Sequence, residues 1–188
     1  MRRKLFDTIL QIIPIMIGVY LGFVISNWQD SQKRNTQSKV LIENIKMEIE
    51  TNKSTIERVI DYHKMLRDST RYYSNAETVS TMPTFFQGTR TQQFSSSAYN
   101  TGIQTGIINE LPLNKIQLLN KVYNFQEFSN DYSKMLMNGL ITMDFSEDQA
   151  SLKRIANYLS VTMTDIVIQE ERLLELYDET LKNLNSPK

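Results

Sequence analysis

Residues 41–73 read LIENIKMEIETNKSTIERVIDYHKMLRDSTRYY, a stretch without glycine or proline in which apolar residues return at alternating spacings of three and four. This spacing places one stripe of side chains on a single helix face, as in a packed helical seam. The seam consists of Ile42, Ile45, Ile49, Asn52, Ile56, Val59, His63, Leu66, Thr70 and Tyr73. We therefore expect a long helix over about residues 30–74 that packs against other helices.

A second stretch without breakers lies between Gly139 and Pro187. Ser146 followed by Gln149 matches a capping box, so a helix is expected over about residues 146–185. Its apolar face carries Leu152, Ile155, Leu159, Ile166, Leu173 and Leu181, and its opposite side carries Glu170, Glu171, Glu175, Asp178 and Glu179. We interpret those acidic residues as a solvated helix surface.

The remaining helix breakers of the chain's polar part gather in its middle, at Pro83, Gly88, Gly102, Gly106 and Pro112. This predicts an irregular, aromatic-rich region over about residues 75–111, with a short helix from Ser95 ended by Gly106. Pro112 suits a first helical position, and a helix over about residues 112–138 follows.

Upstream of the seam, Ile9 to Ile25 (ILQIIPIMIGVYLGFVI) contains no charged residue and only one strongly polar one, Gln11. About 20 helical residues span a hydrocarbon layer of about 30 Å, so residues 1–29 are expected to form a transmembrane anchor. Trp28 falls at the interfacial level that indole rings prefer. A secretory signal peptide is the alternative, but the run is long and VISNWQD offers no small-x-small cleavage site.

The expected fold class is therefore all-α, with an N-terminal transmembrane helix continuing into an elongated antiparallel bundle of three to four helices. Residues 30–188 form the helical soluble domain of this scheme, with the connecting elements at the end far from the membrane. Arg2, Arg3 and Lys4 precede the apolar run directly, which favours a cytoplasmic N-terminus and an extracytoplasmic domain in a bacterial inner membrane.

Small residues recur every four positions within the anchor, at Gly18, Gly22 and Ser26. Such a stripe lets two helix backbones approach closely in lipid, so these residues are candidates for membrane-helix packing. Glycine is also simply common in membrane helices, which is the alternative explanation.

Composition argues against several function classes. Three of the 21 basic residues and one of the 21 acidic residues precede the apolar run, which leaves 18 positive and 20 negative side chains from residue 29 onward. This slightly acidic part lacks the basic face that nucleic acid requires. Cysteine is absent, which excludes disulfides and thiolate metal sites.

No arrangement of residues supports catalysis. The single histidine, His63, lies on the seam, where we expect it, like Asn52, to be a satisfied interior polar group. Neither HExxH nor a phosphate-binding glycine loop is present. The sequence therefore predicts no enzyme, no catalytic residue, no cofactor and no metal ligand.

Ten of the aromatic residues lie between Tyr72 and Tyr132. Burial in a small second core is the expectation from their size. The alternative is a partner-binding loop with Phe85 and Phe86 as anchors.

Two parts of the chain resemble a family of uncharacterised bacterial single-pass membrane proteins. One is IGVYLGFVISNWQDSQKRNTQSKVLIENIKMEIETNKSTI, and the other is SSSAYNTGIQTGIINELP followed by LLNKVYNF. Together they cover about a third of the chain. The resemblance implies a bacterial envelope protein and carries over no functional residue.

Two functions compete. The first is a membrane-tethered helical protein that self-associates as a homo-oligomer or docks onto another membrane protein as a structural or accessory subunit. The second is an extracytoplasmic bundle that senses a small-molecule ligand and signals through a partner. A concave aromatic pocket would favour the second.

Overall fold

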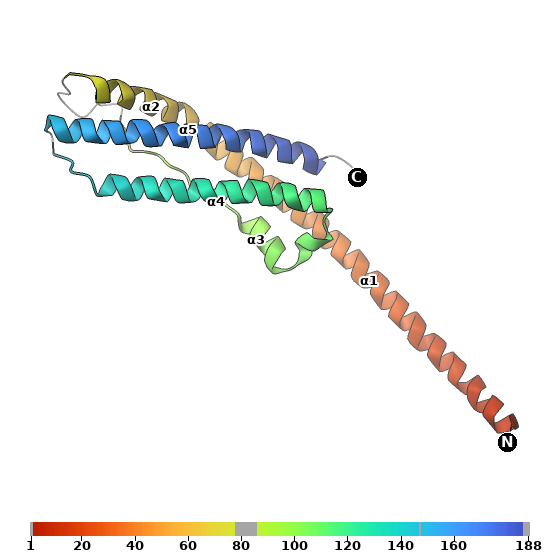
Figure 1. The fold of residues 1–188 in the computed structure, drawn as a ribbon. Coiled ribbons are helices and arrows are strands. Elements are labelled where there is room, and N and C mark those ends of the chain that lie inside the picture. The colour runs from red at the N-terminus through yellow and green to blue at the C-terminus, as the bar shows by residue number, and fades with distance from the viewer. Residues whose placement is uncertain (1, 78–85, 147, 186–188) are drawn as a thin grey trace.

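The computed structural model describes residues 2–77, 86–146 and 148–185, with side chains from residue 14 onward. Its elements are α1 (Arg2–Glu57), α2 (Ile60–Asn75), α3 (Ser97–Gln104), the 3₁₀ helix η1 (Ile107–Glu110), α4 (Leu113–Ile141) and α5 (Gln149–Asn185). No strand occurs in these ranges. The predicted all-α bundle is confirmed (Figure 1).

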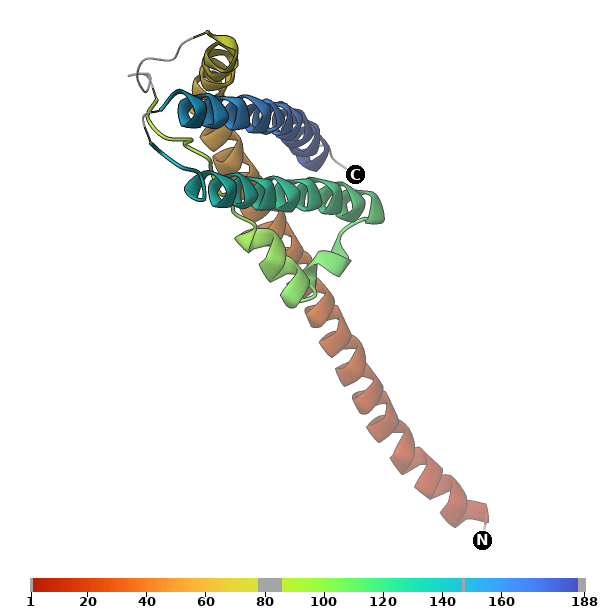
Figure 2. The same ribbon diagram turned by 60° about the vertical axis from the view of Figure 1, so that its left-hand side comes forward.

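Helix α5 packs antiparallel to the continuous path of α1 and α2. Lys53 pairs with Asp178, His63 with Glu170, and Arg71 with Thr164, so one residue number rises as the other falls. Helix α4 runs beside α5 in the opposite direction (Figures 1 and 2). The antiparallel packing of the first and last long helices is therefore as predicted.

The seam of residues 42–73 faces the interior. Ile45, Ile49 and Ile56 are fully buried in a core formed by α1, α3, α4 and the C-terminal half of α5. A second core joins Leu66 of α2 to the other halves of α4 and α5. Two cores along one bundle explain why it is elongated.

The long helix predicted over about residues 30–74 is interrupted, although this range contains no glycine or proline. Helix α1 ends at Glu57 and α2 begins at Ile60, with Val59 at φ −118° and its N–H bonded to the Ile56 carbonyl. α1 crosses the bundle obliquely (Figure 1), so a straight continuation would leave α5. The break keeps Ile60, His63 and Leu66 buried against α5.

The connection after α2 does not stay at one end of the bundle as expected. Residues 86–96 run extended along the helices, and α3 and η1 lie beside α1 near the point where it leaves the bundle (Figure 2). Gly106 adopts φ +72° between α3 and η1, which fits the predicted end of the short helix. This return path carries aromatic residues back into the first core.

The third helix spans Leu113–Ile141, close to its predicted range, whereas the start of the last helix differs from the prediction. Asp148, rather than Ser146, caps α5, because its Oδ1 accepts the Ala150 and Ser151 N–H groups. The hydrogen bond from the Ser146 hydroxyl, followed by those from Ser151 and Ala150, holds the Asp148 pKa well below its ordinary value. Gly139 lies in the last turn of α4, where an added Cβ would collide with the Tyr158 hydroxyl. It therefore serves close packing with α5.

The first half of α1 projects from the bundle as a single rod (Figure 1). Within the residues whose side chains are described, no helix combines the length and the apolar character needed to cross a lipid bilayer. Residues 1–13, which hold the beginning of the predicted anchor, lie outside the described side chains. The anchor is thus not supported by the structure and stays a prediction.

Candidate functional site

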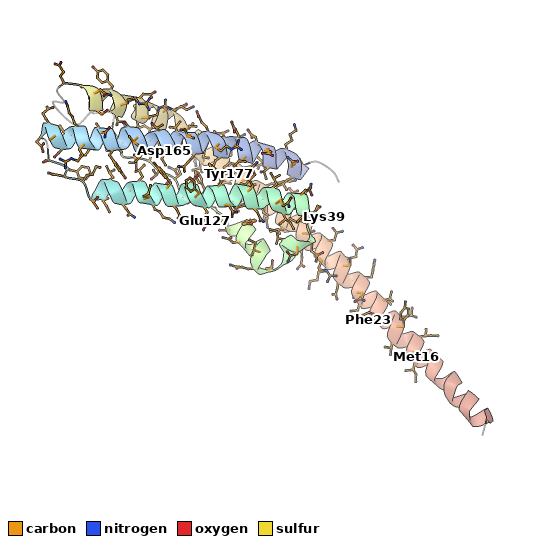
Figure 3. All side chains as sticks on the ribbon, in the orientation of Figure 1. Met16, Phe23, Lys39, Glu127, Asp165 and Tyr177 are labelled. Atoms are coloured by element: carbon orange, nitrogen blue, oxygen red, sulfur yellow. The ribbon has the colours of Figure 1, made fainter. Side chains whose placement is uncertain are left out.

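The projecting part of α1 presents its large apolar side chains to the surroundings. We call residues 14–28 the apolar segment. Ten large hydrophobic side chains in it are 43–71% exposed. They are Ile15, Met16, Ile17, Val19, Tyr20, Leu21, Phe23, Val24, Ile25 and Trp28. Met16 and Phe23 point away from the helix with no other element beside them (Figure 3).

The predicted packing stripe also lies free on this rod. A Cβ added to Gly18 or Gly22 would meet nothing within 4 Å, and Ser26 is exposed. Trp28 is 63% exposed at the end of the apolar segment nearest the bundle. The fold brings these residues into contact with no other helix of the described chain.

The proposed partner-binding loop is described only in part. Phe85 lies outside the described residues. Phe86 is half-buried and packs against the second core, which includes Leu66 and Leu136. The other aromatic side chains are divided: Tyr99 stacks on Tyr123 in the first core at 4.1 Å between ring centres, whereas Phe128 is exposed.

A polar cluster lies within the first core. The Asn52 side chain donates to the Ser95 carbonyl at 2.8 Å and accepts the Ser95 N–H at 3.0 Å. Gln126 donates to the same carbonyl and accepts hydrogen bonds from Asn52 and Tyr177. Asn52, Gln126 and Tyr177 are almost fully buried, as such groups can be when their hydrogen bonds are satisfied. The cluster thus binds residues 86–96, which we call the extended segment, to α1, α4 and α5.

His63 and Glu170 form a second buried polar site. The His63 Nδ1 lies 2.8 and 3.0 Å from the two Glu170 carboxyl oxygens, and its Nε2 lies 2.9 Å from the Thr89 carbonyl. A carbonyl can only accept, so Nε2 carries a hydrogen. A second proton then lies between Nδ1 and the carboxyl group. The pair is either a histidinium–carboxylate pair or a neutral imidazole with a carboxylic acid, neutral overall in both cases.

Glu170 was wrongly assigned to the solvated face of the last helix. Its side chain is only 6% exposed, whereas neighbouring Glu171 is 52% exposed and pairs with Lys64. The prediction for His63 and Asn52 as satisfied interior groups is confirmed. A buried histidine needs a hydrogen-bond partner, and this need was the one signal that could have pointed to Glu170.

Tyr62 and Asn130 hold the rest of the extended segment. The Tyr62 hydroxyl donates to the Gly88 carbonyl at 2.6 Å and accepts the Gln87 N–H at 3.0 Å. The Asn130 amide bonds the N–H and the carbonyl of Phe94 at 2.9 and 3.1 Å. These side chains thus supply the hydrogen bonds that extended backbone would receive from a neighbouring strand in a sheet. This arrangement fixes a loop; it does not offer reactive groups.

Among the described side chains, no three of His, Cys, Asp and Glu lie close enough together to hold a metal ion. His63 is near only one carboxyl group, and both of its nitrogens are engaged. The Thr89 carbonyl occupies the position that a substrate would need for proton transfer through Nε2.

Burial and nearby carboxylates raise the pKa of several tyrosines. For Tyr123 and Tyr177 the cause is burial and then the charge of Glu48, and for Tyr132 it is burial and then its bond to Asp165. A tyrosine pKa that is higher in the folded chain contributes stability below the unfolded value of about 10. That stability is lost as the pH rises through the folded pKa.

We expect these tyrosines to ionise only as the bundle unfolds above pH 10, which absorbance at 295 nm with and without urea would measure. Simple, unfolding-independent titration of all nine tyrosines near pH 10 would contradict this.

No protein family model, curated protein or solved structure matches this chain. The resemblance to bacterial single-pass membrane proteins is not tested by these comparisons and stays a hypothesis.

Proposed function

We propose that this chain is a non-enzymatic, membrane-tethered helical protein that self-associates or docks as a structural or accessory subunit in a bacterial envelope. The observation that carries the proposal is the apolar segment, residues 14–28, exposed on a rod that the bundle leaves uncovered. The apolar run of the sequence begins earlier, at Ile9.

Moving a large aliphatic or aromatic side chain from water into an apolar medium stabilises it by about 1.5–3 kcal/mol. Ten such side chains stand on the apolar segment, far more than the scattered apolar residues of an ordinary surface. A lipid bilayer covers a lone helix on all sides, which a single groove on a partner does not.

The tether is tested by charging the apolar segment. We expect the double variant Val19→Arg and Phe23→Arg to leave the membrane fraction, because an arginine at the centre of a membrane helix costs about 2.5–3.5 kcal/mol. Flotation of the full-length chain with vesicles after a carbonate wash measures this. Val40→Arg is the matched control, since Val40 lies on the same helix with 55% exposure but beyond the apolar segment.

If the wild-type chain stays at the bottom of the gradient, the tether is refuted. If the double variant floats as well as the wild type, the apolar segment is not what binds lipid. Either outcome is readable because the segment contacts no part of the bundle, so unfolding is not expected.

For orientation, we propose a cytoplasmic N-terminus and an extracytoplasmic bundle. The support is the cluster Arg2, Arg3 and Lys4 directly before the apolar run. A C-terminal epitope should then be digested by protease in intact spheroplasts. Digestion of the epitope only after lysis would indicate the opposite orientation, with the bundle in the cytoplasm.

Ligand sensing is the second candidate, and one cavity favours it. A cavity of about 260 Å³ lies between α3 and α4, with Tyr99, Tyr123, Asn124 and Glu127 among its lining residues. All of its lining residues other than the two tyrosines are polar or charged, so it suits a small polar molecule. A rise in melting temperature with free amino acids or monosaccharides, lost in Asn124→Leu, would support sensing.

A further inference from the structure

The outer face of α4 and α5 carries four large apolar side chains that the bundle leaves uncovered. Phe128 and Met135 are seven residues apart on α4, and Val161 and Ile168 are seven residues apart on α5. Each is 55–58% exposed. We call these four residues the α4–α5 patch. Residues seven apart lie on the same helix face, so each helix contributes one short stripe.

The contacts between the two helices fix how the stripes align. Tyr132 donates to Asp165 at 2.6 Å, the Tyr158 hydroxyl bonds the Leu136 carbonyl, and Lys121 pairs with Glu179. In this antiparallel register Phe128 lies level with Ile168, and Met135 lies level with Val161. The Tyr132–Asp165 bond lies midway between the two levels, and Asp165 faces the space between the helices in Figure 3.

We propose that the α4–α5 patch binds the same patch of a second copy of this chain. A two-fold axis parallel to the helices would place Phe128 against Ile168 of the second copy, and Met135 against its Val161. All four apolar side chains then meet apolar side chains, as an isologous interface requires.

A two-fold axis perpendicular to the helices would also bring apolar groups together, with Phe128 against Met135 of the second copy. That dimer would be antiparallel, and its two projecting rods would leave at opposite ends. Two chains anchored in one bilayer from the same side must instead point the same way. The choice of the parallel dimer therefore rests on the proposed membrane tether.

The size of the patch agrees with a tethered partner. Four half-exposed side chains offer on the order of 400 Å² per copy, at roughly 100 Å² each, which is about half of a standard interface. Such a patch is too small for a tight dimer between freely diffusing chains. Tethering in one membrane raises the effective concentration toward the millimolar range, where weak contacts are occupied.

The natural absence of cysteine makes a register test possible. Full-length single-cysteine variants are reconstituted in pairs in the same vesicles and treated with a mild oxidant. We expect M135C with V161C, and F128C with I168C, to give mixed disulfide dimers at least tenfold above F128C with V161C. That offset pair is misaligned by seven residues, or about 10 Å. M47C paired with itself is the control, because Met47 is 57% exposed on α1.

Each outcome decides one question. Dimers from F128C with M135C, in place of the aligned pairs, would show antiparallel association and overturn the proposal. Flotation of the protein without any specific cross-link would overturn the patch and leave the tether intact. A chain that neither floats nor cross-links would refute both. As a second check, Ile168→Lys should lower the M135C–V161C yield at least tenfold, while Met47→Lys, which places the same charge on an equally exposed apolar position of α1, should not.

Discussion

Replacing Glu170 with alanine is expected to lower the free energy of unfolding by about 3–5 kcal/mol, because it breaks a buried pair and leaves its partner uncompensated. His63 is fully buried and has no solvent to replace the carboxyl group. The Nε2 bond to the Thr89 carbonyl keeps one hydrogen in place, so Nδ1 faces an empty site. Urea unfolding followed by circular dichroism measures the loss.

The neighbouring residue supplies the control. Glu171→Ala removes an exposed pair with Lys64 at 2.8 Å and should cost no more than about 1 kcal/mol. The two variants delete the same group one position apart on α5. Equal effects would mean that burial of the His63–Glu170 pair does not contribute to stability as described.

Replacing Asn52 with alanine is expected to cost about 2–3 kcal/mol and to release the extended segment locally. The variant leaves the part-buried Ser95 N–H without its acceptor, and an unmade buried hydrogen bond costs about 1–3 kcal/mol. Lost packing of the amide among α1, α4 and the segment adds to this. Hydrogen exchange of the Ser95 amide should accelerate at least tenfold in Asn52→Ala.

Asn183→Ala is the matched comparison for this second variant. Its amide bonds the Glu179 carbonyl on the exposed side of α5, so unfolding should change by less than about 0.5 kcal/mol. If Ser95 exchanges equally fast in the wild type and in Asn52→Ala, the segment is not held by Asn52.

Several features of the fold could be read from local sequence. The three–four spacing from Ile42 to Tyr73 defined a buried helix face, and the same rule found the apolar face of α5. Gly106 marked the end of α3 because its backbone adopts a positive φ. These features depend on neighbours within one or two turns, and helical periodicity reports them directly.

The break between α1 and α2 could not be predicted in this way. No glycine or proline lies between Glu57 and Ile60, and the oblique crossing of α1 over the bundle is a property of the whole fold. The reason for a glycine at position 139 is also tertiary, because the ring of Tyr158 on α5 leaves no room for a Cβ there. A glycine in the sequence can therefore mark close packing between two helices as well as the end of a helix.

By itself, the sequence determined that the chain is helical, which faces of its long helices are apolar, and that His63 and Asn52 are interior. Only the tertiary structure decided their partners, since Glu170 lies 107 residues from His63 and Gln126 lies 74 residues from Asn52. Periodicity describes one helix at a time, so it identifies the side chains that must be buried. The register between helices sets which polar groups meet there, and it arises from the packing of all of them together.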